Sequence, residues 1–473
     1  MSRTSRIVLF AAFGLLGLFV VAAAWLGLVD ANAYKPRLEA SASSALGMEV
    51  RVVGNVAIGL APGLRVTLED VHVRSRAMDV VSAQQATIAI DLMSVLAKEI
   101  RIESIVLKHP VITIERDLDG RFNFERPQAA ADAAPRDGPD VSVSNGSVVY
   151  ADKRFGQGFE GRDCRLEARG LRSSGGQRAN VARTLSFTAQ VSCAEVRKGG
   201  FVVSDLKFTA DMKDGTLDLK PVTTRVFDTE GVGSVHADFS GPVPLYQIGY
   251  TLSQFPIEAF LKTVSHPNVA AGRMDFSAHL STQGSTAKDL RQGMKGQISL
   301  RGKNLTLSGS DLDRAFERFE SSQNFNLVDV GAFFFVGPLG LVVTKGYDFA
   351  TIAQAQGGSS EIRTLVSEWE VEHGVAQARD VAMATKENRV ALRGRLDFVS
   401  DRFDGVSLAL VDAKGCATVQ QKISGTFQDP VVEKPNIAAS VVGPALRLLK
   451  KGRELLTGGQ CDVYYAGSVA APK

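Results

Sequence analysis

The sequence predicts a mainly β protein held at a membrane by an N-terminal helix. Two observations lead to this fold class. Short runs of alternating apolar and polar residues recur along the 473-residue chain, which also has 45 glycines. Such runs, bounded by Gly, Asp, Asn or Pro, are typical of antiparallel strands with one apolar face. The second observation is a long apolar stretch near the N-terminus.

This stretch runs from Ile7 to Val29 and follows Arg3 and Arg6. Its 23 residues would form a helix of about 35 Å, enough to cross a hydrocarbon core of about 30 Å. A secretory signal has an apolar region of only about 7–15 residues, although the run Ala22-Ala23-Ala24 would also suit cleavage. Because basic residues precede the stretch, we expect a cytoplasmic N-terminus and a body on the other side of the membrane.

The alternating runs give most of the chain one apolar face. In residues 65–75 the alternation shifts at the pair Asp70-Val71 and then resumes. In residues 205–212, one face takes Leu206, Phe208, Ala210 and Met212. Roughly 20–25 such runs can be counted. A sheet of more than about ten strands tends to curl or split. The pattern leaves open separate sandwiches, which composition favours, a barrel, or a trough whose lining faces something else.

Helical spacing is confined to four short segments. Residues 34–47 have Pro36 in the first turn and Gly47 as a stop, with an apolar side of Leu38, Ala42, Ala45 and Leu46. Residues 310–322 open with Ser310 and Asp313 as an expected capping box, and have Leu312, Ala315, Phe316 and Phe319 at helical spacing. Residues 255–264 and 443–459 are the other expected helices.

A Pro- and Ala-rich stretch without a hydrophobic pattern is expected as a flexible linker. The expected organisation is a cytoplasmic tail (1–6), a membrane anchor (7–29), an N-terminal β module (30–126), the linker (127–140), a central β region (141–250) and a C-terminal β region with amphipathic helices (251–473).

The four cysteines fit an oxidising compartment. Cys164 and Cys193 lie 29 positions apart, Cys416 and Cys461 lie 45 apart, and no CxxC spacing points to zinc or thioredoxin-like chemistry. Two structural disulfides of roughly 3–4 kcal/mol each are expected. Spacing alone does not fix the pairing, so nearest-neighbour pairing is a working hypothesis and buried free thiols are the alternative.

The sequence has no recognisable catalytic motif. Its six histidines form no HExxH pair, and neither a G-x-S-x-G elbow nor a phosphate loop is present. The 54 basic and 51 acidic residues are spread along the chain, which argues against a nucleic-acid partner. We therefore expect no enzyme activity, no metal site and no cofactor.

Several stretches resemble the AsmA family of bacterial envelope proteins. In residues 29–73 the resemblance rests on the Tyr34-Lys35-Pro36 helix entry, Gly47, Gly54, Pro62 and the run Leu68 to Val71. In residues 100–125 it rests on Pro110 and the run Asp119 to Asn123, although Phe124 stands where the family usually has Trp. Residues 415–435 and 458–472, with Cys416 and Cys461, resemble the family's C-terminal region. These motifs are structural, so no catalytic residue is carried over.

The resemblance implies an inner-membrane anchor, a periplasmic body and a role in outer-membrane assembly or lipid homeostasis. Larger relatives resemble β-groove conduits for lipids, which favours an elongated, curved antiparallel β-sheet trough. The first functional hypothesis is that the trough binds or transfers phospholipid acyl chains. The alternative is a non-transport scaffold or regulator of outer-membrane protein assembly with a self-packed sheet. The expected partners are membrane lipids, the inner membrane and, for the scaffold, outer-membrane assembly components.

An apolar segment in the second half of the chain is a candidate for the trough lining. Residues 330–343 comprise 14 uninterrupted apolar residues, fewer than the roughly 17–20 that span a membrane. We expect two short strands joined at Gly337-Pro338, either buried on both sides or lining the trough beside the helix over 310–322. The candidate lipid-binding residues are Phe316, Phe319, Phe333, Phe334, Phe335, Leu339 and Leu341.

Overall fold

The structure is a computed structural model that describes residues 31–60, 63–75, 78–96, 101–119, 121–124, 136–153, 156–173, 181–263, 270–309, 311–314, 316, 334, 358–433 and 461–472. These residues are mainly β with a few short helices, which confirms the predicted fold class at that level. The chain divides into two compact units, Met1–Thr216 and Leu217–Lys473. The division lies inside the stretch 141–250 that we expected as one central region.

The expected membrane anchor, residues 7–29, lies outside the described residues. Among the residues that are described, no helix is both long enough and apolar enough to span a membrane.

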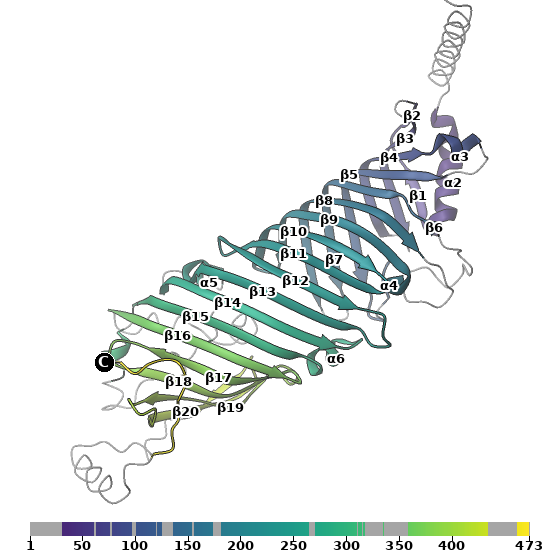
Figure 1. Cartoon of the computed structure of the whole chain (residues 1–473). Coiled ribbons are helices and arrows are strands. Elements are labelled where there is room, and N and C mark those ends of the chain that lie inside the picture. The colour runs from purple at the N-terminus through teal and green to yellow at the C-terminus, as the bar shows by residue number, and fades with distance from the viewer. Residues whose placement is uncertain are drawn as a thin grey trace, which may run out of the picture. The chain divides into compact units, whose positions relative to one another are not determined.

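Unit 1 contains strands that lie side by side and curve (Figure 1). They are β1 (Glu49–Val52), β2 (Val56–Gly59), β3 (Leu64–Ser75), β4 (Met78–Ile90), β5 (Ile102–Arg116), β6 (Arg136–Asp137), β7 (Asp140–Asp152), β8 (Gln157–Ser173), β9 (Leu185–Lys198) and β10 (Phe201–Lys213). Both β1 and β2 pair with β3, and β6 pairs with the end of β8. From β3 to β10 the other strands pair in order, antiparallel except for β5 with β7.

The parallel pair β5–β7 follows from the long connection between these strands. Parallel neighbours need a crossover of a dozen or more residues, and the stretch 117–139 is long enough. This connection includes the expected linker, 127–140, whose end differs from expectation. Strand β6 lies within it and β7 begins at its last residue, so the sheet resumes before the linker was expected to end.

Helix α2 (Lys35–Leu46) covers one end of the sheet in unit 1, after the 3-10 turn η1 (Ala31–Tyr34). As predicted, Pro36 lies in the first turn, and Gly47 ends the helix with a φ of 66°. Leu38 and Ala42 pack on apolar residues of β1 to β4. Leu46 is 39% exposed, so the buried side of the helix is narrower than the sequence suggested. The short helices α3 (Leu92–Leu96) and α4 (Val181–Thr184) complete the unit.

Unit 2 contains a second run of strands, together with α5 (Ile257–Thr263) and α6 (Ala287–Gln292). The strands are β11 (Thr216–Val226), β12 (Thr229–Asp238), β13 (Leu245–Pro256), β14 (Ala270–Gln283), β15 (Lys295–Ser308), β16 (Ser359–Glu372), β17 (Val375–Ala384), β18 (Arg389–Asp397), β19 (Arg402–Val411), β20 (Ala417–Gly425) and β21 (Pro430–Val432). From β12 to β21 each strand pairs antiparallel with the next.

The expected helix over 255–264 is present as α5, and its Phe260 and Leu261 are buried. In the expected helix over 310–322, Leu312 and Phe316 are also buried, as their spacing predicts. The expected capping box depends on Ser310, which lies outside the described residues. The carboxylate of Asp311 accepts the Arg314 N–H at 3.1 Å, whereas that of Asp313 accepts from the Asn388 side chain at 2.8 Å. Asp313 therefore ties this segment to the β17–β18 turn.

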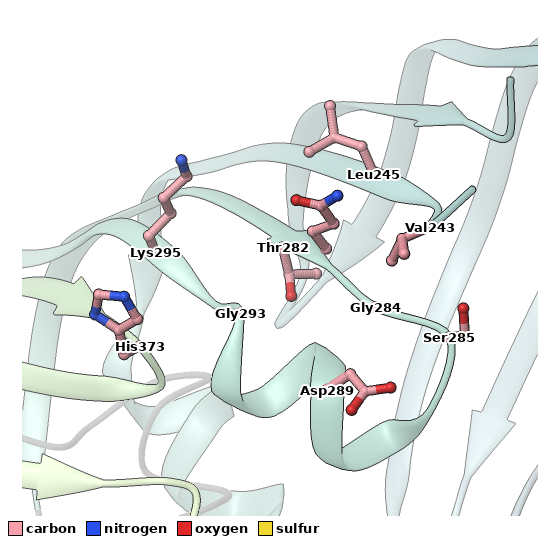
Figure 2. A pocket seen from close by; sticks show the side chains of 10 residues that line it. Val243, Leu245, Thr282, Gly284, Ser285, Asp289, Gly293, Lys295 and His373 are labelled. Atoms are coloured by element: carbon pink, nitrogen blue, oxygen red, sulfur yellow. The ribbon is translucent and has the colours of Figure 1, made fainter. Parts of the chain in front are cut away.

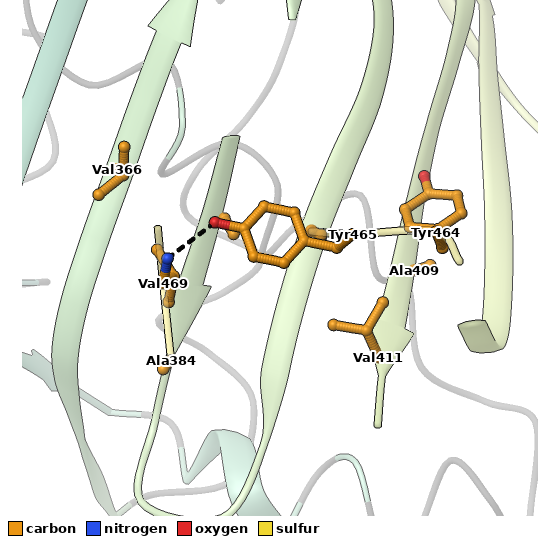
Figure 3. Packing of buried hydrophobic residues seen from close by; sticks show 9 residues of the cluster. Val366, Ala384, Ala409, Val411, Tyr464, Tyr465 and Val469 are labelled. Atoms are coloured by element: carbon orange, nitrogen blue, oxygen red, sulfur yellow. Dashed lines mark hydrogen bonds between the residues drawn. The ribbon is translucent and has the colours of Figure 1, made fainter. Parts of the chain in front are cut away.

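The C-terminal segment, residues 461–472, packs on one face of β17, β18 and β19 (Figure 3). This face carries small side chains, including Ala382, Ala391 and Ala409, which let the backbone of the segment approach closely. Tyr464 and Tyr465 are 7% exposed, and the Tyr464 hydroxyl donates to the Ser407 carbonyl at 2.7 Å. The sheet is consequently covered on this face by the end of the chain.

Candidate functional site

The sheet of unit 1 has a continuous apolar face. Residues that pair across neighbouring strands form apolar rows perpendicular to the strands. One row is Leu68, Ala86, Leu107, Val143, Leu166, Val191 and Phe208; the next is Val66, Ile88, Ile105, Val141, Ala168, Ala189 and Ala210; a third is Val73, Val81, Ile112, Val148, Gly161, Val196 and Val203. Since β3, β4, β5 and β7 to β10 all contribute to each row, the apolar face extends over this whole series of strands.

Most of these strands contain one residue with a left-handed backbone conformation, and these residues keep the rows on one face. The residues are Asp70, His109, Asn145, Asp163 and Asp205, with φ between 48° and 52°. Asn, Asp and His tolerate this conformation better than other residues with a side chain. In β3, Leu68 and Val71 are both buried although two exposed residues separate them, so the alternation of buried and exposed residues changes phase here. The pair Asp70-Val71 had predicted this irregularity from the sequence. We call it the phase shift.

The apolar face is covered near α2 but only half-buried farther along. Val66 and Leu68 are 9% and 8% exposed, and the cluster that α2 covers ends at Leu107. Beyond it, the apolar residues of β8 to β10 in the first row are partly exposed. Phe159 on β8 is 42% exposed and stacks on Tyr150 with ring centroids 5.3 Å apart. This half-buried part, on β5 and β7 to β10, is the candidate site.

The opposite face of the same strands is charged and solvated. Arg162 lies 2.9 Å from Glu160, and Arg197 pairs with Glu195. The hydrogen bond from Arg162 holds the pKa of the Glu160 carboxyl below its usual value. The sheet of unit 1 therefore separates an apolar side from a charged one.

The Cys164–Cys193 disulfide, confirmed by the structure, lies on the apolar face. The two residues are direct partners on β8 and β9, with Cα atoms 4.0 Å apart. A Cβ at Gly161 would lie 3.1 Å from the Cys164 sulfur, so this glycine leaves room for the bridge. The disulfide thus lies on the face that forms the candidate site, with both cysteines buried.

The apolar face of unit 2 has an open part and a closed part. Ile248 pairs with Val235 and Leu280 and is 44% exposed. Four residues along β13, Leu252 is fully buried, and Leu300 on β15 is also fully buried. We call the row Val235, Ile248 and Leu280 the open row of unit 2.

Tyr250 lies at the boundary between these two parts. Its ring lies over β12, where a Cβ at Gly231 or Gly233 would collide with it. Its hydroxyl is 2.8 Å from the Thr224 hydroxyl. Burial raises the pKa of Tyr250.

The described lipid-binding candidates lie in the closed part. Phe334 and Phe316 are 0% and 1% exposed. The Ser367 hydroxyl donates to the Phe334 carbonyl at 2.8 Å and accepts from the Trp369 indole at 2.8 Å. The other candidates lie outside the described residues: Phe319, Phe333, Phe335, Leu339 and Leu341. A lipid-binding role of this segment stays a prediction. The rows of unit 1 were not predicted from the sequence, although alternation placed Leu206 and Phe208 on one apolar face.

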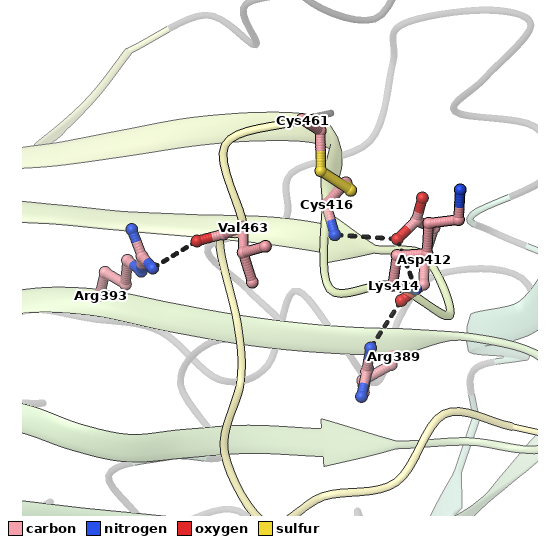
Figure 4. The surroundings of a disulfide bond; sticks show 7 residues. All are labelled: Arg389, Arg393, Asp412, Lys414, Cys416, Cys461 and Val463. Carbon is pink, nitrogen blue, oxygen red and sulfur yellow. Dashed lines mark hydrogen bonds between the residues drawn. A yellow bond between two sulfur atoms is a disulfide. The ribbon is translucent and has the colours of Figure 1, made fainter. Parts of the chain in front are cut away.

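The second predicted disulfide, Cys416–Cys461, is also confirmed (Figure 4). It joins the C-terminal segment to the turn before β20. Beside it, Arg393 donates to the Val463 carbonyl at 2.7 Å, and Arg389 to the Val469 carbonyl at 2.9 Å. The helix that we expected this bridge to hold, residues 443–459, lies outside the described residues.

The sequence model of the AsmA family matches residues 1–184. This part of the chain belongs to the AsmA family. The AsmA region includes α2, the strands β1 to β8 and the first half of the rows described above. No curated protein and no solved structure matches the chain. Within the described residues, no three His, Cys, Asp or Glu side chains gather in a way that would hold a metal ion.

Proposed function

We propose that the protein binds phospholipid acyl chains on the half-buried apolar face of unit 1. The observation that carries this proposal is the row Leu107, Leu166, Val191 and Phe208, which the described residues leave partly open on one side of a sheet whose other side is charged. Burial stabilises an apolar chain by about 0.8 kcal/mol per CH₂ group. A ligand made of many such groups suits an extended surface without polar groups.

The dimensions of this face suit one acyl chain. Neighbouring strands lie about 4.8 Å apart, so the five strands from β5 to β10 that form the site extend over roughly 19 Å. An acyl chain of one leaflet occupies half of a hydrocarbon core of about 30 Å, or about 15 Å. A chain lying across the strands would therefore fit on the face.

The proposed setting is the bacterial envelope, with the stretch 7–29 in the inner membrane and the body in the periplasm. The AsmA match and the two disulfides support this setting, because disulfides persist in oxidising compartments. In this setting a lipid-binding face would serve outer-membrane biogenesis by shielding acyl chains from water. No step of covalent chemistry is part of the proposal.

The scaffold alternative draws support from the closed part of unit 2. There, Leu300, Leu365 and Trp369 are nearly or fully buried within the protein itself, as a self-packed core requires. If unit 1 were also covered in the cell, for example by a protein partner, the chain would hold no lipid. The experiment below separates the two functions.

The test places a photo-crosslinking amino acid at Leu166 or at Arg165 in the full chain. These two residues are adjacent in β8, but their side chains lie on opposite faces of the sheet. We expect lipid adducts, identified by mass spectrometry after irradiation of cells, at Leu166 and not at Arg165. Protein adducts at Leu166 without lipid would instead support the scaffold.

A further inference from the structure

Strand ends in unit 2 enclose a cavity of about 450 Å³ (Figure 2). The side chains around it include Lys295 and His373, which are both exposed. Lys295 pairs with Ser281, the neighbour of Leu280, so its side chain lies on the face opposite the open row of unit 2. The cavity is therefore a recess at the surface of the unit and does not extend the apolar row.

Strand ends in unit 1 carry a different feature, two adjacent exposed apolar side chains. They belong to α3, in the connection between β4 and β5 (Figure 1). Leu92 is 49% exposed and Met93 is 71% exposed. We call these two residues the apolar tip. Because single exposed apolar residues are common on protein surfaces, exposure alone does not indicate a partner. The hydrogen bonds around the tip and the path of the chain do.

Hydrogen bonds fix the backbone on both sides of the apolar tip. The buried hydroxyl of Ser94 donates to the Asp91 carbonyl at 2.6 Å and accepts the Arg101 N–H at 3.0 Å. The Asp91 carboxylate accepts the Met93 N–H at 3.0 Å, and the Asp91 N–H donates to the Arg101 carbonyl at 3.0 Å. The tip is consequently held in its exposed position, and a contact there would cost little ordering of the backbone.

The register of the strands shows which strand ends lie beside the apolar tip. Leu64 at the start of β3 pairs with Ile90 at the end of β4, and Ile90 pairs with Ile102 at the start of β5. Gly59 at the end of β2 pairs with Arg65. The tip follows Ile90 by only two positions. We call these ends of β2 to β5 the α3 strand ends.

The chain enters unit 1 close to the α3 strand ends. The Val50 N–H donates to the Ser43 hydroxyl at 2.8 Å, and the Val56 N–H donates to the Asn32 side chain at 2.9 Å. From α2 back to η1 the chain therefore follows β1 and then β2 toward Gly59. Val56 lies three positions before Gly59, which is about 10 Å along a strand.

The apolar stretch 7–29 ends two positions before Ala31, the first described residue. Two residues extend over at most about 7 Å. The link from this stretch to the α3 strand ends is therefore on the order of 20 Å, whereas the 15 residues of β5 extend over about 50 Å. Leu118, which follows the far end of β5, is 73% exposed as well. The path of the chain thus brings the apolar tip, and not Leu118, close to the end of the stretch.

Resting on the proposed function and its setting, with the stretch 7–29 in the inner membrane, we propose that the apolar tip docks on the surface of that membrane. Leu92 and Met93 would lie among the lipid headgroups and the first methylene groups of the acyl chains. A protein partner suits the tip less, since a stable protein interface takes about 20–30 residues from each side. Attachment to the membrane, by contrast, keeps even a small contact at high effective concentration.

The charges beside the apolar tip balance one another. Arg65 and Arg101 are matched by Asp91 and Glu103 at the same strand ends. The contact is therefore apolar in character and does not depend on anionic lipids. A second contact beside a single membrane helix would restrict the rotation of unit 1 about that helix. The candidate site would consequently keep one orientation toward the membrane.

The test uses a fluorophore on an introduced cysteine, in the full chain reconstituted in nanodiscs of phosphatidylethanolamine and phosphatidylglycerol. The four native cysteines form the two disulfides, so the introduced thiol takes the label. Met93→Cys is compared with Leu118→Cys, because the two side chains are similarly exposed and lie beyond opposite ends of β5. The quenchers are phospholipids brominated on the acyl chains and, in the water, iodide.

We expect brominated lipids to quench the label at Met93 and iodide to leave it bright. The label at Leu118 should show the opposite behaviour. Quenching at Met93 by iodide and not by lipid would overturn the proposal. A label at Met93 protected from both quenchers would place protein on the tip, and equal lipid quenching at both positions would remove the preference for the α3 strand ends. Either result would overturn the proposal too.

A second set of variants tests the apolar tip without a label on it. The label is placed on Ile102→Cys, and the tip is either wild type or Leu92→Ser with Met93→Ser. Substitution of exposed side chains should leave the melting temperature nearly unchanged, while quenching by brominated lipids should fall. The matched control, Leu118→Ser, should leave the quenching as it is. Equal quenching with and without the tip would show that Leu92 and Met93 do not make the contact.

A label on Ala24→Cys, within the stretch 7–29, tests the setting by itself. If brominated lipids fail to quench this label, the inner-membrane setting of the proposed function fails, and the docking of the tip fails with it. If they quench the label at Ala24 and not the one at Met93, only the docking is overturned and the proposed function stands.

Discussion

Phe334 and Phe159 have the same side chain in opposite surroundings, one 0% and the other 42% exposed. We expect Phe334→Ala to lower the free energy of unfolding of unit 2 by about 3–5 kcal/mol, because it leaves a cavity in the core. Phe159→Ala should change stability by less than about 1 kcal/mol and reduce lipid adducts at Leu166. Denaturant unfolding followed by fluorescence measures the first effect. Similar stability losses in both variants would contradict the assignment of Phe334 to the core and Phe159 to the open face.

We expect the stability of the protein to depend on pH through the Tyr464 hydroxyl. Burial raises its pKa to about 12, whereas a tyrosine in an unfolded chain titrates near 10. Between these values the unfolded chain has released the proton and the native chain still binds it, so stability falls as pH rises from about 10 to about 12. Unfolding measured across this window should show the loss in the wild type and a smaller one in Tyr464→Phe. Equal slopes would show that Tyr464 titrates normally.

At the scale of the element, the left-handed residues are the most specific feature of the strands. Asn145 in β7 has a φ of 52°. Asn145→Gly should be nearly neutral, whereas Asn145→Val should cost about 1–2 kcal/mol or more, because a β-branched residue is strained there. Thermal unfolding of the two variants gives the comparison. A valine variant as stable as the glycine variant would mean that β7 can pair without the phase shift.

The C-terminal segment is held by a disulfide and by polar contacts at several points. The disulfide closes a loop of 45 residues. Removing it in the double variant Cys416→Ser with Cys461→Ser should lower the free energy of unfolding by about 4 kcal/mol at most. Arg389 and Arg393 still bind the segment through Val469 and Val463, so we expect docking to persist with faster local opening. Limited proteolysis after residue 461 should accelerate in the double variant. If cleavage is equally slow without the bridge, the arginine contacts alone hold the segment.

Across the whole chain, the two units should differ in local stability. Strands β16 to β19 have residues buried on both faces, whereas β8 to β10 have a charged face and a half-buried one. Amides in strands covered on both sides open less often, because opening exposes more apolar surface. Hydrogen exchange of the full chain should therefore be slower in β16 to β19 than in β8 to β10. The reverse order would indicate a cover on unit 1 that the described residues do not include.

The sequence predicted features that depend on neighbouring residues and missed those that depend on distant ones. Pro36 and Gly47 mark the ends of α2, and Asp70-Val71 marks the phase shift, because each acts through its own backbone. The role of Asp313 was not predictable, since its partner Asn388 lies 75 residues away. Phe334 was found as apolar, but alternation alone does not say which face another part of the chain will cover.

The phase shift also constrains how the gene of this protein can change in length. Val66 and Val73 reach the same face of β3 although an odd number of positions separates them, and Val141 and Val148 do the same in β7. Deleting one residue between the members of such a pair would leave them at an even spacing, so the strand would have to lose its phase shift and would fall out of register with neighbours that keep theirs. Insertions and deletions should therefore accumulate in the turns and spare the middle of the strands. A strand of unit 1 should tolerate substitution of its residues far better than a change in their number.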